Sequence, residues 1–572
     1  MSFLKQRGYL LSVVAIGAVL AFAACGGGNN ESAGTTSPGA SGAPSDLAPD
    51  SDQKMTMNIR AEPNTIDPQG QSYTYEATVV KNTYITLFDQ DPKTTALTAY
   101  AAQDVPTKDN GGISSDGLTY TIKLRSGLKW SDGTPLTAAD FVYGIIRGYN
   151  LNVSGAGYGG FITAIKGAKE ALALDPKSAT YVADVNAALK DSIVAVDDTT
   201  LKFVLANASV SFPYNLFLPI TAAVKKSNVD ALGDSFGQAA GAGQMITSGP
   251  FVVTEWAPKD HITMVRNENF TARHTAYLKQ ITAKVIEDRV QAYNAFQAGQ
   301  IDLTEVPATV YPGVKDDPRV HQESEFGTRW ITVDATLPPW NNKDFVIGIN
   351  QATDREALAR DVFFGTYKAY FAPCADTLFA CDPSLFSNLD FNLDKAKASI
   401  VKAYPDGNIP DVTLDTLDDA TSKATVTTLQ SQWKQVGVNV KIVTTDQKTL
   451  RADLKNHVSG TQITGWGMDY GDPTDLWSIK TKDQIGANNL GFYDRPGYDA
   501  LENKQDTTYD PNQRKDILTQ LQQFYAADPA DITFGVKQRT DIVNPKLKGL
   551  VTSSLDYEIF GDQFLADIYV SK

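Results

Sequence analysis

Residues 120–143 have the sequence YTIKLRSGLKWSDGTPLTAADFVY, and this stretch decides the fold. The side chains of residues 118–124 alternate between apolar and polar, as expected of a half-buried strand. Residues 131–134 (SDGT) have the composition of a tight turn. Thr137 is followed three positions later by Asp140, which is the spacing of a capping box, so we expect a helix to begin directly after Thr137. A strand, a turn and a helix are therefore predicted in close succession.

The same alternation of strand and helix extends to both sides of this stretch. Gly299 and Gly437 each follow a segment of helical periodicity, in the position where glycine commonly ends a helix. We expect strands at 55–59, 201–205, 251–253, 262–265, 301–303 and 438–442, and helices at 76–87, 292–298 and 420–436. This order predicts an α/β protein rather than an all-β sandwich or a helical repeat.

The N-terminus has the features of a secretory leader. Lys5 and Arg7 precede an uncharged apolar run over residues 9–24. This run is shorter than the roughly 20 apolar residues that a permanent membrane span needs. We therefore expect residues 1–24 to be a signal peptide that is removed.

Residues 20–26 (LAFAACG) resemble a bacterial lipobox, in which the cysteine receives a diacylglycerol and becomes the first residue of the mature protein. Phe22 departs from the leucine usual at that position, whereas Ala24, Cys25 and Gly26 fit the pattern. We therefore expect lipid on Cys25. The alternative is an ordinary cleaved leader that carries a stray cysteine.

The segment after Cys25 is predicted to be a flexible tether. From Gly26 to about Gln53 it consists mostly of Gly, Asn, Ser, Thr, Pro and Ala, and it has too little apolar side chain to offset the entropy of ordering. No other segment of the sequence has the length and apolarity of a membrane-spanning helix. We expect residues 25–53 to hold a folded body away from a membrane anchor.

The charge of the chain excludes some partners. Its formal net charge is −15, and removal of the leader takes away two cations and no acidic residue. A surface of this sign repels nucleic acid and anionic lipid, so we expect neither as a partner. The length of 572 residues suggests two or more domains or lobes.

Apart from Cys25, the cysteines are Cys374 and Cys381. They lie seven residues apart, and in an oxidising compartment such a pair is expected to close a loop as a disulfide. Two free thiols or half of a metal site remain as alternatives. No His or third Cys lies near enough in the sequence to complete a metal site.

The sequence contains no familiar catalytic or metal-binding motif. It has neither a P-loop nor a Gly-x-Ser-x-Gly elbow, and its acidic residues at 415–419 (DTLDD) precede a predicted helix, where they favour the positive helix end rather than catalysis. The histidines lack the close spacing of a His-Glu-x-x-His helix; they are His261, His274, His321 and His457. We therefore expect no enzyme activity, no metal and no cofactor.

Several segments resemble, in order, the motifs of the extracellular solute-binding proteins of family 5, the oligopeptide- and dipeptide-binding class of ABC importers. Residues 120–143 are the most specific match. The others are 62–68 (EPNTIDP), 248–251 (SGPF) with 266–270 (RNENF), 295–302 (AFQAGQID) and 465–473 (GWGMDYGDP). The resemblance covers nearly all of the chain from about Met55. The resemblance is stronger evidence of family membership than of ligand identity, because this fold includes proteins that bind peptides, nickel chelates, sugars and other solutes.

The resemblance implies a two-lobed, periplasmic-binding-protein-like α/β fold of type II, cluster C, with an extra subdomain on lobe one. By analogy, lobe one comprises residues 54–80, 205–310 and 543–572, its subdomain residues 81–204, and lobe two residues 311–542. Solute is expected to bind in the cleft between the lobes. A solute that touches both lobes stabilises their closed form by its differential affinity.

The resemblance also implies the binding residues. In peptide-binding relatives the Trp-x-x-Asp element supplies the carboxylate that holds the α-ammonium of the peptide. Here that role falls to Asp469, with Trp466 lining the site and Gly465 in the same motif. Tyr470 and Tyr75 are further pocket candidates by position. The alternative is a structural role, as a turn cap for Asp469 and as core residues for the two tyrosines.

The function implied is that of a substrate-binding lipoprotein of an ABC transporter. We expect a monomer, at the cell surface or in the periplasm, that captures oligopeptides or dipeptides and delivers them to the permease subunits in the cytoplasmic membrane. One alternative is a binder of a non-peptide solute, such as an oligosaccharide or a metal chelate, on the same fold. The other is a lipid-anchored surface receptor or enzyme.

Overall fold

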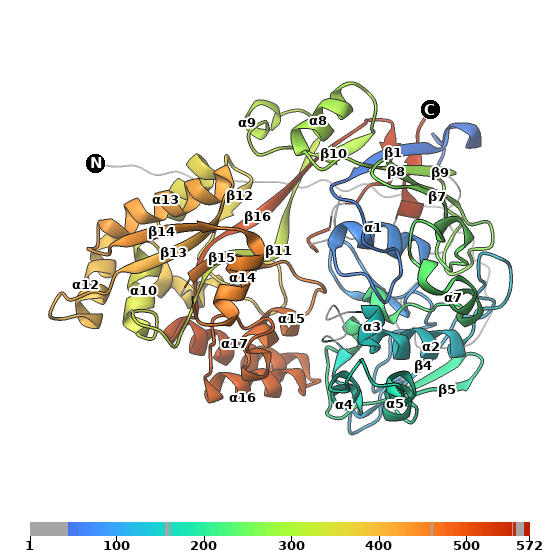
Figure 1. The fold of residues 1–572 in the computed structure, drawn as a ribbon, viewed down its shortest axis with the longest axis horizontal. Helices are drawn as coiled ribbons and strands as arrows, with labels where there is room; N and C mark the ends of the chain where they lie inside the picture. Colours follow the sequence, from blue (N-terminus) through green and yellow to red (C-terminus); the bar gives the residue numbers. More distant parts are fainter. Residues whose placement is uncertain (1–43, 155–159, 161, 459–460, 552, 556–564) are drawn as a thin grey trace, which may run out of the picture. The chain divides into compact units, whose positions relative to one another are not determined.

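The computed structural model describes residues 44–154, 160, 162–458, 461–551, 553–555 and 565–572 (Figure 1). The leader, Cys25 and residues 26–43 of the predicted tether lie outside these ranges. Within them, no helix combines the length and the apolarity that crossing a membrane requires.

Most of the strands form one mixed sheet. Parallel pairs, such as β1 with β9, and antiparallel pairs, such as β11 with β15, both occur in it. In spatial order its strands are β14 (Val440–Thr445), β13 (Val412–Leu417), β15 (Thr461–Trp466), β11 (Val320–Val333), β16 (Asp531–Val543), β10 (Leu303–Glu305), β1 (Lys54–Ile59), β9 (Gln280–Val285), β8 (His261–Arg266) and β7 (Phe251–Ala257), while β12 (Tyr367–Ala369) pairs with β16. Helices alternate with these strands along the chain, which confirms the α/β class.

The long strands β11 and β16 connect the two ends of this sheet (Figure 1). They run antiparallel, with Val320 opposite Ile542 near one end and Thr332 opposite Asp531 near the other. On its other edge β16 pairs with β10, where Leu303 lies opposite Val543 and Glu305 opposite Asp541. The strands of lobe one and of lobe two, as the sequence assigned them, therefore meet through β16.

The remaining strands form smaller sheets. They are β4 (Thr119–Lys123), β6 (Thr200–Val204) and β5 (Ile193–Asp197) in one sheet, β2 (Phe88–Gln90) with β3 (Leu97–Ala99) in another, and β17 (Leu547–Lys548) with β18 (Tyr569–Val570) in a third. The first two lie wholly within residues 81–204, the stretch assigned to the subdomain. The exact domain boundaries stay a prediction.

The helices range from single turns to 17 residues. They are α1 (Thr74–Thr83), α2 (Ala138–Gly148), α3 (Leu151–Ser154), α4 (Ala168–Leu172), α5 (Tyr181–Leu189), α6 (Phe212–Asn215), α7 (Lys226–Leu232), α8 (Arg289–Gln297), α9 (Tyr311–Val314), α10 (Lys343–Ala352), α11 (Arg355–Ala357), α12 (Leu393–Ala403), α13 (Ala420–Lys434), α14 (Gln447–Lys455), α15 (Pro473–Trp477), α16 (Pro496–Asp506) and α17 (Pro511–Ala527).

The local signals in the sequence are confirmed. Thr137 precedes α2, and its backbone N–H donates to Oδ2 of Asp140 over 2.8 Å, as in a capping box. Asp419 caps α13 by accepting the N–H of Ser422 over 2.9 Å. Gly299, which follows α8, has a φ of +70°, a backbone conformation that glycine adopts without steric cost.

The helix predicted at 76–87 is wrong at its C-terminal end. α1 ends at Thr83, and Tyr84 is already extended, with φ −126° and ψ 153°. The N–H of Ile85 donates to Oγ of Ser248 over 3.0 Å, and both residues are buried. A contact with a distant segment therefore outcompetes the local helical periodicity.

The predicted tether also ends earlier than expected. Gln53 is buried, and its side-chain amide donates to the carbonyl oxygens of Ala48, over 3.0 Å, and Val570, over 2.9 Å. The N–H of Lys572 donates to the carbonyl oxygen of Asp46 over 2.8 Å. Residues 46–53 are thus held against the C-terminal residues 570–572 by hydrogen bonds that composition alone does not disclose.

The buried apolar residues form separate clusters, two of which pack on opposite ends of the main sheet. One, built on β1 and β7 to β10, includes Met57 and Phe251. A second packs α10, α12 and α13 against β11, β13 and β14 and includes Trp433. A third contains Tyr120 and Phe203 of the three-stranded sheet together with Tyr498 of α16. Segments far apart in the sequence therefore meet in this third cluster.

Glu502 on α16 generates a testable pH dependence. Burial, together with the nearby carboxylate of Asp506, raises the pKa of Glu502 from 4.5 to about 8. Between these two pH values the folded protein keeps a proton that the unfolded chain has released. The contribution of Glu502 to stability is therefore full below pH 4.5 and falls by about 1.4 kcal/mol per pH unit as the pH rises toward 8.

Replacing Glu502→Gln removes this titration. The free energy of unfolding, measured in urea at pH 5, 6 and 7, should fall less steeply with pH in the variant than in the unaltered protein. The two curves should diverge by about 1.4 kcal/mol per pH unit. Parallel curves would contradict the assignment.

Candidate functional site

The motif of residues 465–473 begins at the end of β15, beside β11. Gly465 lies opposite Arg329 and Trp466 opposite Thr328. The two strands approach closely here, because a Cβ atom on Gly327 would lie 2.4 Å from the carbonyl oxygen of Trp466. Glycine at position 327 therefore permits the pairing that fixes the end of β15.

The loop after β15 is held by a buried carboxyl group. Asp475 on α15 is fully buried, and its Oδ2 accepts the backbone N–H of Asp469 over 2.7 Å. Burial and the neighbouring carboxylate of Asp469 raise the pKa of Asp475 well above its usual range. The two carboxyl groups therefore disfavour ionising together.

An ion pair anchors the other end of the loop. Oδ1 of Asp472 caps α15 by accepting the N–H of Thr474 over 2.9 Å, and the same carboxylate pairs with both terminal nitrogens of Arg514, over 2.6 and 2.7 Å. Burial opposes ionisation of Asp472, but Arg514 outweighs it and lowers the pKa of the carboxyl group. The bidentate pair fixes the position of α15 relative to α17.

The loop also contacts the turn between β2 and β3. The N–H of Gly471 donates to Oε1 of Gln90 over 2.7 Å. A Cβ on Gly471 would lie 2.2 Å from Cβ of Thr95, so a larger residue does not fit. The ring of Tyr470 stacks on Tyr214 of α6, with 6.2 Å between their centroids. Residues assigned to different lobes thus meet at this loop.

The structure brings four of the predicted site residues together: Gly465, Trp466, Asp469 and Tyr470 occupy one strand end and the loop that follows it. Asp469 is partly exposed, whereas Tyr470 is buried. Tyr75 lies on another element, α1, where its ring stacks on Tyr73 with 5.3 Å between centroids. The ligand-binding role of all five stays a prediction.

Asp475 was not singled out from the sequence. Nothing in its sequence position distinguishes it, because its role arises from the fold of the loop back onto α15. The second oxygen of Asp475, Oδ1, is buried, and so is the indole nitrogen of Trp466. The Trp466 side chain favours the ionised form of Asp475, but burial and Asp469 outweigh it.

The remaining predicted residues lie elsewhere. Cys374 and Cys381 are joined as a disulfide, with their Cα atoms 6.0 Å apart. Their loop lies beside β11, where Oγ1 of Thr328 donates to the carbonyl oxygen of Pro373 over 2.6 Å. Cys25 lies outside the described residues. Over the residues that the structure describes, no group of three or more His, Cys, Asp or Glu side chains could hold a metal ion.

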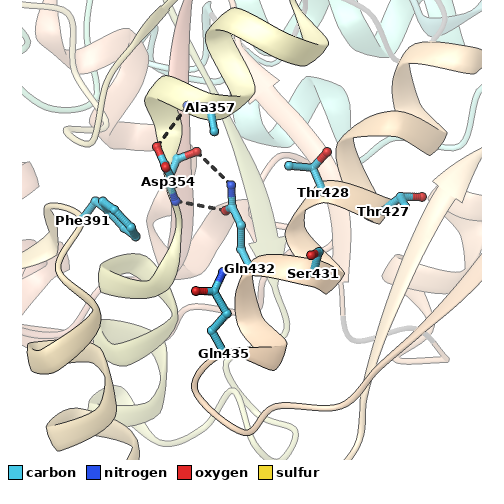
Figure 2. A pocket seen from close by; sticks show the side chains of 8 residues that line it. All are labelled: Asp354, Ala357, Phe391, Thr427, Thr428, Ser431, Gln432 and Gln435. Atoms are coloured by element: carbon cyan, nitrogen blue, oxygen red, sulfur yellow. Dashed lines mark hydrogen bonds between the residues drawn. The ribbon is translucent and has the colours of Figure 1, made fainter.

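A hollow of about 470 Å³ lies apart from these residues, between α13 and the segment around α11 (Figure 2). The backbone N–H of Asp354 donates to Oε1 of Gln432, and the Gln432 amide donates to the carbonyl oxygen of Asp354, each over 3.0 Å. These polar groups satisfy one another without a ligand. The hollow is lined by Asp354, Ala357, Phe391, Thr427, Thr428, Ser431, Gln432 and Gln435, none of which belongs to the predicted site.

The family described as bacterial extracellular solute-binding proteins, family 5 Middle, matches residues 104–488. The oligopeptide-binding protein OppA of Bacillus subtilis is 24% identical over 87% of this chain and 90% of its own length. The probable deoxycholate-binding periplasmic protein YgiS of Escherichia coli is 26% identical over 83% and 86%. Among solved structures, the unliganded open form of the murein tripeptide-binding protein MppA superposes with a TM-score of 0.74 at 21% identity, covering 92% of this chain and 99% of its own. These likenesses confirm the fold that the sequence motifs implied.

The contact at Gly471 yields a prediction about stability. Gly471→Ala places a Cβ atom against Thr95, and relieving this overlap should destabilise the protein by roughly 1–3 kcal/mol. Gly313→Ala is the matched control, because a Cβ there meets nothing within 4 Å. Thermal unfolding of both variants checks the prediction. Equal melting temperatures for the two would show that the loop does not depend on this close approach.

Proposed function

Because the chain belongs to the bacterial extracellular solute-binding proteins of family 5, we propose that it captures short peptides outside the cytoplasm and delivers them to the permease of an ABC importer. The observation that carries the proposal is the Trp466–Asp469 element at the end of β15, held in place by Asp475 and meeting the β2–β3 turn through Gly471. The peptide-binding name of the B. subtilis relative supports the choice of ligand. Family membership points to binding rather than to catalysis.

Asp469 is proposed to hold the α-ammonium group of the peptide. A buried ammonium group needs a carboxylate partner, since an unpaired charge is costly to take out of water. The backbone N–H of Asp469 donates a hydrogen bond to Asp475, and this bond fixes the position of the Asp469 backbone. Because the pKa of Asp475 is raised, the carboxyl groups of Asp469 and Asp475 together carry limited negative charge, which suits the binding of a single cation.

Binding is proposed to bring the two lobes together around the peptide. The loop after β15 belongs to lobe two and contacts Gln90 and Thr95, which the sequence assigned to the subdomain of lobe one. A solute that touches both sides favours the closed arrangement by its differential affinity. A permease could then distinguish the loaded from the empty protein.

A second candidate function is the binding of a non-peptide solute on the same fold. The probable deoxycholate-binding relative favours it, since its identity to this chain is comparable to that of the oligopeptide-binding one. The two functions differ in whether a cationic end of the ligand must be neutralised. Replacing the Asp469 carboxylate therefore distinguishes the peptide-binding function from the non-peptide one.

Asp469→Ala should weaken peptide binding by about 2–5 kcal/mol, because the ammonium group loses its charged partner. The measurement is calorimetry with alanine oligomers of two to five residues. Asp516→Ala, at an exposed position on α17, is the matched control and should leave the affinity unchanged. Equal affinities for all three proteins would refute the role of Asp469, and the absence of heat with any oligomer would favour the non-peptide solute.

We also propose that lipid on Cys25 anchors the protein to the outer face of the cytoplasmic membrane. The lipobox-like residues 20–26 support this proposal. Cys25→Ser should move the protein from the membrane fraction to the medium or periplasm, and it should abolish incorporation of labelled palmitate. If the variant stays in the membrane fraction, the anchor is not the lipid.

A further inference from the structure

The C-terminal end of α16 contacts a segment that lies about three hundred positions earlier in the sequence. The backbone carbonyl oxygen of Asp506 accepts the N–H of Val210 over 2.7 Å, and its Oδ1 accepts the N–H of Ser211 over 3.1 Å. The sequence assigned residues 205–310 to lobe one and α16 to lobe two. α16 lies far from β10, where the strands of the two lobes meet (Figure 1). A contact this far from the crossing strands breaks when the lobes swing apart.

Two tyrosines extend this contact. The hydroxyl oxygens of Tyr120 on β4 and Tyr509 after α16 lie 2.8 Å apart, and the Tyr120 hydroxyl also donates to the carbonyl oxygen of Ser209 over 2.7 Å. A Cβ on Gly117 would lie 2.9 Å from the Tyr509 ring, so glycine permits the ring to approach. Nζ of Lys108 lies 4.2 Å from the centre of the same ring. Tyr509 therefore rests on a surface that the other part of the chain provides.

The carboxyl group of Asp506 has neighbours of both charges on its own side. Oγ1 of Thr474 donates to its Oδ1 over 3.3 Å. Arg514 favours its ionised form, whereas Asp472 opposes it. The titratable groups whose charges interact with that of Asp506 are Tyr120, Tyr470, Asp472, Glu502, Tyr509 and Arg514. No single counter-ion therefore fixes the charge of Asp506.

The segment of residues 209–211 covers this carboxyl group from the other side. Burial raises the pKa of Asp506 above its usual range, and the hydroxyl groups of Ser209 and Ser211 oppose this shift without cancelling it. When the segment moves away, water reaches the carboxyl group and its pKa returns toward the usual value. The closed form therefore keeps a proton that the open form releases.

We propose that Asp506 and Tyr509 form a clasp with residues 117 and 209–211 that exists only in the closed form and couples closure to the uptake of a proton on Asp506. This inference rests on the proposed function, because closure around a solute is part of it. The clasp lies outside the residues proposed to hold the peptide. Asp506 and Tyr509 are therefore positioning residues, which change the affinity through the closure equilibrium alone.

The direction of the pH effect follows from the two protonation states. The contribution of Asp506 to closure is fully present below its pKa in the open form, and it is lost as the pH rises through its higher pKa in the closed form. Between these two values, one proton changes the closure equilibrium by at most about tenfold per pH unit. Acidification therefore tightens the binding of a solute that the closed form holds.

The first experiment removes one hydroxyl group from the clasp. Tyr509→Phe should weaken the binding of alanine oligomers, measured by calorimetry, by about two- to tenfold, because a hydrogen bond made only in the closed form is lost. Tyr293→Phe is the matched control. Its hydroxyl group accepts a hydrogen bond from Gln297 over 2.8 Å at an exposed position of α8. Melting temperatures verify that both variants are folded.

The second experiment removes the titrating group. Between pH 5 and pH 7, the affinity of Asp506→Asn should depend less on pH than that of the unaltered protein. Calorimetry in two buffers of different ionisation enthalpy should show that the variant takes up fewer protons on binding, by at most one. Asp516→Asn, at an exposed position of α17, should behave as the unaltered protein. Asp469 and Asp475 are present in all three proteins, so the difference between the proteins isolates Asp506.

The third experiment measures closure without a peptide. Spin labels are attached at Lys190→Cys and Lys515→Cys, both exposed, in a chain that also carries Cys25→Ser. Pulsed electron spin resonance gives the population of the short distance between the labels. This population should fall from pH 5 to pH 7 in the unaltered background, stay constant when Asp506→Asn is added, and be smaller at each pH when Tyr509→Phe is added.

The outcomes separate this inference from the function on which it rests. If Tyr509→Phe and Tyr293→Phe agree in both affinity and distance, the clasp does not exist. If Asp506→Asn and Asp516→Asn show the same pH dependence in both measurements, closure takes up no proton on Asp506 and the proposed coupling is wrong. If no oligomer binds, the proposed function fails, and the distances alone then decide for or against the clasp.

Discussion

The structure depends on the pairing of one strand, β16, with two others. Residues 541–543 of β16 pair with β10 along one edge, while β11 pairs with the other edge from Ile542 to Asp531. Because hydrogen bonds between strands fix their register, this pairing determines where β15 ends and which side chains share a face. The position of the loop that follows β15 and the contact between Lys537 and Glu325 are both consequences of it.

The sequence predicted those features that neighbouring residues decide. The capping box of Thr137, the cap of Asp419 and the glycine after α8 all depend on side chains a few positions apart. The predictions failed where a distant segment intervened. Ser248 ends the helix before Ile85, and the C-terminal strand orders residues that composition assigned to a tether.

The candidate site could be predicted only through the resemblance of residues 465–473 to a family motif. That motif points to Asp469 but says nothing about Asp475 behind it. Arg329 and Lys537 are about two hundred positions apart, and only the register of β11 on β16 brings both to the carboxylate of Glu325. Buried polar networks of this kind depend on tertiary contacts and leave no periodic trace in the sequence.

We propose that the two lobes, which share one sheet, close on a bound peptide. Small-angle X-ray scattering during a titration with alanine oligomers tests this closure most directly. The radius of gyration should fall and reach its limit at one equivalent of bound peptide, as expected of two states shifted by a ligand. An unchanged radius at a concentration where calorimetry detects full binding would contradict it.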